Sequence, residues 1–282
     1  MSRIGSLRDS ERANPLVTMM RETWRRRVER AEQLSAADTT SRSLIAFYAA
    51  LLRAQAAVHA QLTTAASWQP SGDLESDLSA LRPHLAKILS AVATAGSQSL
   101  RIEARRLLTS GAVDLDDTLL GFWRKPADDQ FFAKAIVQPY AQRLGECGVA
   151  PVGRELGRTS NRCPFCCGAP QVSVLCGASD SALEGGARAL QCATCLMKWP
   201  FRRALCPQCG EEDERKLGYF TTPAFDHLRL ETCETCKHYL KGVDLTRLGY
   251  AVPLVDEVAG APLDAWASQQ GFVKIELNLV GL

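Results

Sequence analysis

Apolar residues recur every three or four positions in the first half of the chain, which is the spacing of one face of an α-helix. In residues 41–62 this face consists of Leu44, Phe47, Leu51, Ala54, Val58 and Leu62. Three further segments repeat the pattern with strong helix formers: residues 76–94, 98–110 and 128–148. Gly111 is a stop signal, and Pro139 is expected to kink or divide the last helix. The pattern predicts an all-helical domain of six or seven helices over residues 1–155.

From residue 156 onward the pattern changes to short β-prone runs rich in Gly, Cys and Thr. These runs lie within residues 170–177, 188–199, 216–222 and 227–245. Because such strands are too short for a large sheet, we expect two small modules with short antiparallel hairpins, at residues 156–203 and 204–282. The tail adds a short helix at about residues 253–267 and a final extended segment. The predicted fold class is α+β.

Composition and charge narrow the class of protein only slightly. Hydrophobic residues make up 46% and charged residues 23% of the chain, and the formal net charge is +2. These values are ordinary for a soluble globular protein and give no general attraction to nucleic acid or membrane. The amino terminus has no apolar secretory segment, and "VERAEQL" follows the arginine run at residues 25–27. We therefore expect a cytoplasmic protein, where eleven cysteines indicate metal or redox chemistry rather than disulfides.

Four CxxC pairs lie in the second half, beginning in the stretch "RCPFCCGAP" at residues 162–170. The pairs are Cys163/Cys166, Cys192/Cys195, Cys206/Cys209 and Cys233/Cys236. They form two similar units of two pairs each. The first and third cysteines of a unit are 29 residues apart in the first unit and 27 residues apart in the second. Arg188 and Arg229 each precede the second pair of a unit by four residues. This similarity indicates tandem copies of one module.

The spacing within each unit suits a tetrahedral metal site. Two cysteines three apart on a tight turn direct both sulfurs to one point, and a second turn across a hairpin completes four ligands. Pro207 and Gly210 favour such a turn, because Pro fixes φ and Gly accepts a positive φ. Four thiolates bind zinc or mononuclear iron with the same geometry, so the spacing leaves the metal open. It also leaves open whether the metals only stabilise small modules.

The chain resembles the formate dehydrogenase accessory protein family, FdhE. The resemblance lies in the four CxxC pairs, "FFAKAIVQPYAQRL", "ETCETCKHYLKGVDLTRLGYAVPLVDEVAGAPLDAWA" and the closing "GFVKIELNLVGL". It implies a helical domain followed by two rubredoxin-like modules that bind iron, two ions per chain. It also implies a non-catalytic role in maturing formate dehydrogenase through contact with its catalytic subunit. The implied metal ligands are Cys163, Cys166, Cys192 and Cys195 for one module, and Cys206, Cys209, Cys233 and Cys236 for the other.

The sequence departs from the family pattern after the second cysteine of three pairs. Glycine is common there, whereas this chain has Cys167, Leu196 and Lys237, and only Gly210 keeps the pattern. Glycine gives backbone N–H groups room to approach a sulfur, which tunes the potential of an iron site. The departures bear on the identity of the metal and its redox potential more than on metal binding.

Two other functions fit the sequence less well. A nucleic-acid-binding zinc ribbon would need a basic surface, but residues 163–250 contain ten Lys or Arg and ten Asp or Glu. A thiol oxidoreductase usually has one CxxC at a helix start, whereas these pairs flank short strands in matched twos. No Gly-rich phosphate loop or nucleophile elbow supports another enzyme. We expect no nucleic-acid or membrane partner.

The remaining chemistry-bearing residues have simpler interpretations. His59 is expected in the helical core, and His238 on a solvent-facing strand, with a role beside the metal as the alternative. Cys147 and Cys176 are expected to be small buried residues, whereas Cys167 is a spare thiol, an alternate ligand or a site of oxidation. The tryptophans Trp24, Trp123, Trp199 and Trp266 favour core or inter-domain packing over a binding surface.

Overall fold

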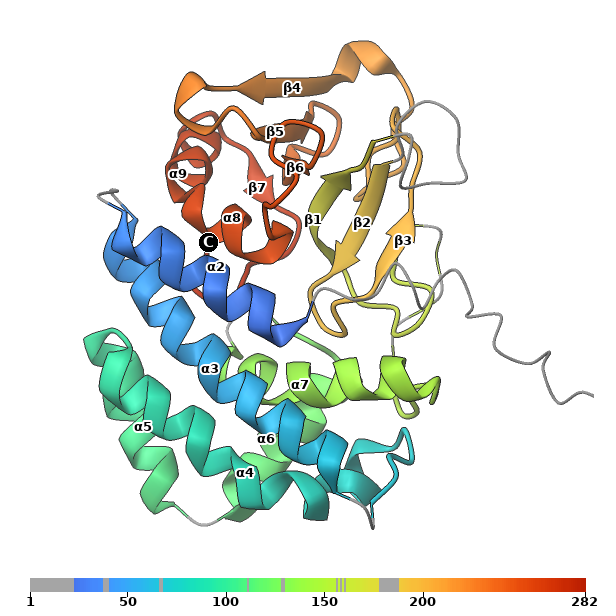
Figure 1. The fold of residues 1–282 in the computed structure, drawn as a ribbon. Coiled ribbons are helices and arrows are strands. Elements are labelled where there is room, and N and C mark those ends of the chain that lie inside the picture. The colour runs from blue at the N-terminus through green and yellow to red at the C-terminus, as the bar shows by residue number, and fades with distance from the viewer. Residues whose placement is uncertain are drawn as a thin grey trace, which may run out of the picture.

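The computed structural model describes residues 23–37, 41–65, 68–110, 112–127, 130–155, 157, 159, 161–177 and 188–282. Within them six helices come first, and a mixed sheet that carries both cysteine units follows (Figure 1). The predicted α+β class is confirmed. The predicted limits of the three domains stay a prediction.

The six helices match the predicted periodicity. They are α2 (Trp24–Ala36), α3 (Arg42–Thr64), α4 (Leu74–Ala95), α5 (Gln98–Thr109), α6 (Ala112–Arg124) and α7 (Phe131–Cys147). The Asp73 side chain caps α4 by accepting from the backbone N–H groups of Glu75 and Ser76. Pro139 lies inside α7 without dividing it, because the surrounding residues of this helix are almost all buried. Gly111 lies outside the described residues.

Helix α3 is the centre of the helical part. It packs against α2, α4 and α7, and it buries Ile45, Leu51, Leu52 and Val58 almost completely. Among the described residues it is also the one helix long and apolar enough to cross a membrane, but half of its most apolar window is buried inside the protein. A buried core helix accounts for this composition.

The strands join into one seven-stranded sheet rather than two separate modules. They are β1 (Pro170–Leu175), β2 (Arg188–Cys192), β3 (Lys198–Pro200), β4 (Leu217–Thr221), β5 (Leu228–Cys233), β6 (His238–Asp244) and β7 (Val273–Lys274). The order is β3-β2-β1-β6-β5-β4, and β7 pairs with the start of β6. Each unit is an antiparallel hairpin, as predicted, but parallel pairing of β1 with β6 places Val172 opposite Lys241 and joins the units.

The two units have the same internal strand order. In each unit the first strand follows the first cysteine pair (β1 and β4), and the second strand ends at the third cysteine (β2 and β5). The third strand follows the fourth cysteine (β3 and β6). The sheet therefore reads third, second, first and again third, second, first, so the repeat predicted from the sequence is a head-to-tail repeat in space.

Two short helices connect the sheet to the helical part. These are α8 (Pro253–Ala259) and α9 (Ala261–Gln269), and α8 contacts β1 and β6 on one side and α2 and α3 on the other (Figure 1). Arg30 of α2 forms a buried ion pair with Asp256 of α8, with 2.5 Å between Nη2 and Oδ1. His227 contacts the same carboxylate at 3.0 Å. Asp256 therefore connects the helical part to the sheet.

Candidate metal centres

The eight cysteines of the CxxC pairs gather into two groups of four. Site 1 is Cys163, Cys166, Cys192 and Cys195, and site 2 is Cys206, Cys209, Cys233 and Cys236. Within each site the sulfur atoms all lie within 4.8 Å of one another. The structure thus brings together the same two sets that the sequence spacing predicts, each able to hold one metal ion.

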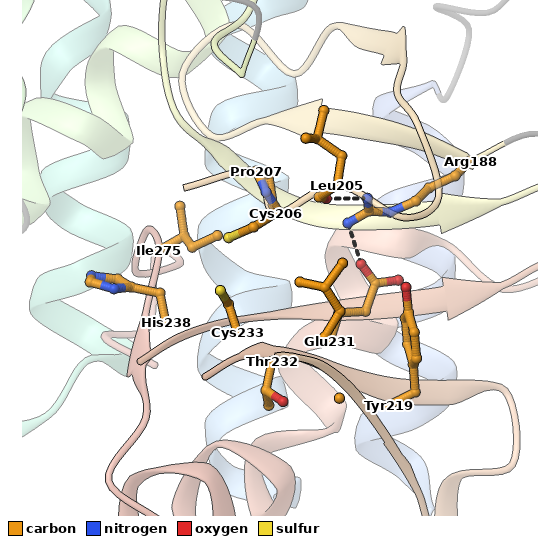
Figure 2. A pocket seen from close by; sticks show the side chains of 12 residues that line it. Arg188, Leu205, Cys206, Pro207, Tyr219, Glu231, Thr232, Cys233, His238 and Ile275 are labelled. Carbon is orange, nitrogen blue, oxygen red and sulfur yellow. Dashed lines mark hydrogen bonds and ion pairs between the residues drawn. The ribbon is translucent and has the colours of Figure 1, made fainter. Parts of the chain in front are cut away.

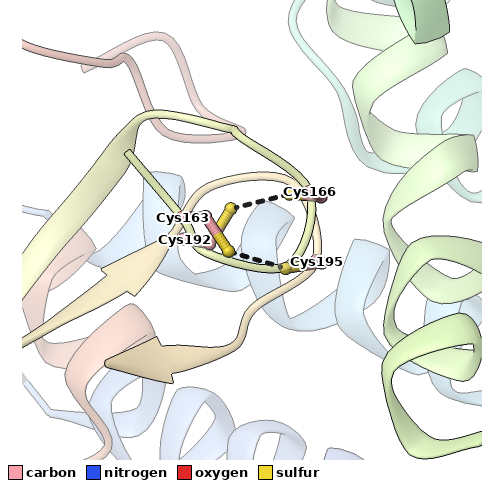
Figure 3. A group of neighbouring side chains, drawn as sticks. All are labelled: Cys163, Cys166, Cys192 and Cys195. Atoms are coloured by element: carbon pink, nitrogen blue, oxygen red, sulfur yellow. Dashed lines mark hydrogen bonds between the residues drawn. The ribbon is translucent and has the colours of Figure 1, made fainter. Parts of the chain in front are cut away.

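The sulfur separations fit a thiolate tetrahedron. In site 1 the Sγ atoms of Cys163 and Cys195 are 3.6 Å apart, and those of Cys166 and Cys192 are 3.4 Å apart (Figure 3). In site 2 the Sγ atoms of Cys206 and Cys236 are 3.8 Å apart, and those of Cys209 and Cys233 are 3.7 Å apart. A tetrahedron with metal–sulfur bonds of about 2.3 Å has edges of about 3.8 Å, whereas a disulfide brings two sulfurs to about 2.05 Å. The donor set therefore fits a divalent or trivalent metal ion, and all eight cysteines are free of disulfides.

The two sites differ in exposure. All four cysteines of site 1 are buried, whereas in site 2 Cys209 is exposed and Cys236 is half-buried. Solvent can therefore reach site 2 more easily than site 1. This difference does not follow from the CxxC pattern, which is the same in both units.

All four turns adopt the same backbone conformation after the second cysteine. Gly210 has a φ of 79°, and the described residues include three non-glycine residues with positive φ: Cys167 (59°), Leu196 (62°) and Lys237 (55°). These three are the departures from the family pattern. Each costs roughly 1 kcal/mol relative to glycine, because Cβ crowds the carbonyl oxygen in this region. The turn geometry is retained, as shown by the backbone bonds from Cys167 to Cys163 (2.8 Å) and from Gly210 to Cys206 (3.0 Å).

Backbone N–H groups point at the sulfurs in both sites. Thr194 donates to Cys192 Sγ at 3.3 Å, and Gln208 donates to Cys206 Sγ at 3.4 Å. Although burial opposes ionisation, hydrogen bonds from the other three sulfurs lower the pKa of the Cys192 thiol. Burial raises the pKa of Cys206 to about 11. Sulfurs held this close favour a bound cation, which would replace their protons.

The other candidate residues lie outside the two groups of four sulfurs. Cys167 is buried and lines a cavity of about 410 Å³ with Arg162, Thr194 and Glu276. Cys147 and Cys176 are half-buried. A small cavity of about 20 Å³, room for about one water molecule, lies beside site 2.

His59 and His238 lie within hydrogen-bonding distance of neighbouring residues, and the tryptophans contribute to packing. His59 contacts Glu146 at 3.0 Å, and Trp24 lies beside its ring. His238 is half-buried on β6, where its Nδ1 lies 2.7 Å from the Cys236 carbonyl oxygen. Trp24, Trp123 and Trp199 are buried, as expected, and Trp266 is half-buried.

The two arginines that precede the second pairs meet at one carboxylate. Arg188 and Arg229 contact the two oxygens of Glu231 at 2.5 Å and 2.6 Å, and Ser173 donates to the same carboxylate at 2.6 Å. Figure 2 shows the Arg188–Glu231 pair beside site 2. Gly242 on the intervening strand leaves room for this contact, since a Cβ there would lie 2.8 Å from Glu231 Oε1. The repeated arginines are visible in the sequence, but their shared partner is not.

A buried ion network holds the tail against the sheet, and sequence reasoning missed it. Lys241 of β6 and Lys274 of β7 both contact Glu257 of α8 and Asp264 of α9. Two ammonium groups therefore face two carboxylates. Asn278 donates to Glu257 at 2.9 Å. The signal was present in "KHYLKG", "VDE" and "LDAW", where charged residues interrupt otherwise apolar segments.

Comparison with known proteins gives a family match in the carboxy-terminal part of the chain and a shared fold over most of its length. Residues 205–280 match the family model described as "FdhE, C-terminal domain". An FdhE homolog from Aquifex aeolicus is 39% identical over 121 residues, which are 43% of this chain and 42% of that protein. A homolog from Haemophilus ducreyi is 33% identical over 138 residues, 49% of this chain and 42% of that protein. The chain thus matches less than half the length of either relative.

The fold extends beyond these aligned residues. The crystal structure of the FdhE protein from Pseudomonas aeruginosa aligns over 91% of this chain and 95% of that chain, with a TM-score of 0.68 and 21% identity. At this identity the comparison establishes a shared fold. The family model therefore places residues 205–280 in the FdhE C-terminal domain family, and the chain as a whole shares the fold of an FdhE protein.

Proposed function

We propose that this protein is a cytoplasmic accessory factor for the maturation of formate dehydrogenase, and that it binds the immature catalytic subunit without catalysing a reaction itself. The family match carries this proposal. It spans residues 205–280, which include all of site 2 and the buried charges of the tail. The residues that the family model matches are therefore those that build the second site and close the sheet on the helices.

We further propose that sites 1 and 2 each hold one iron ion through their four cysteines. Four thiolates suit iron and zinc equally in geometry, and the family resemblance favours iron. When bound, iron would supply one-electron chemistry, whereas zinc would act only as a structural ion. The N–H groups that donate to Cys192 and Cys206 support a tuned redox site, because such hydrogen bonds stabilise thiolate charge.

Deletion of the gene in its host tests the accessory role. Formate dehydrogenase activity should fall, and the wild-type gene should restore it. An affinity-tagged chain should recover the catalytic subunit, and recovery should be greater before the subunit's cofactor is inserted. Unchanged activity in the deletion strain, with no catalytic subunit recovered, would refute the accessory role.

Spectra of protein purified with and without oxygen test the choice of metal separately. Thiolate-bound iron absorbs in the visible range and changes with oxidation state. Two colourless zinc ions per chain would refute the iron assignment and leave the accessory role standing.

A further inference from the structure

Strand β4 forms an open edge of the sheet and exposes two aromatic side chains. Tyr219 is 48% exposed and Phe220 is 40% exposed. On one face of the sheet Arg229 lies over the Tyr219 ring, and on the other Phe220 packs 4.8 Å from Trp266. In the described part of the chain no strand pairs with the outer side of β4.

Free backbone groups accompany these side chains. Glu234 donates its N–H to the Lys216 carbonyl, and the same antiparallel register places Tyr219 opposite Glu231 and Thr221 opposite Arg229. Because hydrogen-bonded pairs alternate in such a ladder, the N–H groups of Tyr219 and Thr221 point away from β5. The edge thus offers both hydrogen bonds and apolar contact to another strand.

The opposite edge of the sheet is protected. Strand β3 is only three residues long and reads Lys198-Trp199-Pro200. Phe201 donates to the Arg188 carbonyl, so the neighbouring Pro200 faces outward, where it has no N–H to offer. A short edge with Lys and Pro is a common defence against unwanted strand pairing. Strand β4, which reads Leu-Gly-Tyr-Phe-Thr, lacks both residues.

The internal repeat shows what kind of partner fits such an edge. Strand β1 is the counterpart of β4 in the first unit, and its outer side accepts β6 as a parallel strand over four residue pairs. We propose that β4 binds an extended segment of the immature catalytic subunit as an additional parallel strand, which continues the sheet. This inference rests on the proposed accessory function and assigns it a docking site.

The charges around β4 define the chemistry of that segment. Most of the charged residues that flank β4 are already paired with one another: Arg215 with Asp213, Lys216 with Glu211, and Arg229 with Glu231. Apart from the exposed Glu214, the edge therefore offers little unpaired charge to attract an ionic partner. An uncharged segment with apolar side chains at alternate positions would complement Tyr219 and Phe220.

A second copy of this chain is a less suitable occupant. A two-fold axis perpendicular to the sheet would pair two β4 edges antiparallel, whereas the contact between β1 and β6 is parallel.

The double variant Tyr219→Lys/Thr221→Pro gives β4 the Lys-x-Pro pattern of β3 without removing a bond to β5. Its affinity for the immature, cofactor-free catalytic subunit should fall at least tenfold, while its metal content and melting temperature stay close to those of the wild type. The matched control is Ile102→Lys on α5, where another large apolar side chain is 61% exposed. This control should bind normally. If the double variant does not fold, the single variant Thr221→Pro takes its place. This variant changes one exposed residue and removes one backbone N–H group that points away from β5.

Hydrogen exchange gives a second measurement on the wild-type complex. The amide protons of Tyr219 and Thr221 should exchange more slowly when the catalytic subunit is bound. Wild-type affinity in a folded edge variant, or unchanged exchange at β4, would overturn the docking site and leave the accessory function intact. A wild-type chain that does not bind the catalytic subunit would instead overturn the proposed function and this partner together. Self-association that the edge variant abolishes would identify a second copy as the occupant and overturn the proposal.

Discussion

The buried ion network permits a quantitative prediction about how the tail holds the sheet. Glu257 is fully buried, and its carboxylate contacts the ammonium groups of Lys241 and Lys274. The substitution Glu257→Gln removes one negative charge while nearly preserving volume. Two buried ammonium groups then face the single carboxylate of Asp264.

The expected loss of stability in Glu257→Gln equals the free energy needed to remove a proton from one of the two buried lysines. Burial already holds the pKa of Lys274 below its usual value of 10.5, so Lys274 is the group that loses its proton in the variant. Deprotonation at pH 7.5 of a group with a pKa of 10.5 costs about 4 kcal/mol, because each pKa unit corresponds to about 1.4 kcal/mol. The lowered pKa reduces this cost. We expect the free energy of unfolding to fall by about 3 kcal/mol, near the lower end of the range for broken buried ion pairs.

The same contacts predict the pH dependence. Although burial opposes ionisation, Lys241 and Lys274 lower the pKa of Glu257 from 4.5 to about 2. A lowered carboxyl pKa stabilises the folded state above the unfolded pKa, and this stabilisation is lost as the pH falls toward the folded pKa. The difference between wild type and Glu257→Gln should therefore narrow between pH 4.5 and 2.

Urea unfolding of the metal-loaded proteins at pH 7.5, followed by tryptophan fluorescence, measures the effect. The control is Glu234→Gln, which breaks an exposed pair with Lys237 and should cost less than about 0.5 kcal/mol. Adding Lys274→Met to Glu257→Gln restores charge balance and should recover part of the loss. A cost below about 1 kcal/mol for Glu257→Gln, or a double variant less stable than both single variants, would refute the account.

Two further predictions concern the metal sites. Lys237→Gly should raise the free energy of unfolding by up to about 1 kcal/mol, because this side chain is exposed and glycine adopts a positive φ without strain, whereas Gly210→Lys should lower it by a similar amount. Urea unfolding checks these signs, and a destabilised Lys237→Gly would count against the strain argument. A chelator should release the ion of site 2 before that of site 1, because Cys209 is exposed. Alkylation of cysteines during chelation, read by mass spectrometry, should label site 2 first, and the reverse order would contradict this reasoning.

The sequence was sufficient to predict the composition of both sites. A CxxC pair is a local structure, since two residues between cysteines suffice to close the turn, and the matched units indicate which pairs combine. The conformation after the second cysteine was also predictable at Gly210. It was less certain at Cys167, where the tertiary structure imposes a positive φ on a residue that does not favour it.

The sequence did not predict the long-range contacts. Strands of four to seven residues indicated separate modules, but parallel pairing of β1 with β6 depends on two segments about seventy residues apart. Lys241, Glu257 and Lys274 resemble surface charges when each is considered in its own segment. Their burial becomes intelligible only when α8 and β7 bring opposite charges together. The periodicity of apolar residues predicts one helix or strand at a time, whereas these contacts join several helices and strands.

Metal content per chain is the most direct test of the central claim that the eight cysteines form two separate metal sites. Wild-type protein purified without oxygen should contain two ions per chain. Cys166→Ser and Cys209→Ser, which each change one sulfur of a different site, should each contain one. A wild-type chain that is fully folded without bound metal, or a single-site variant that still binds two ions tightly, would contradict the account.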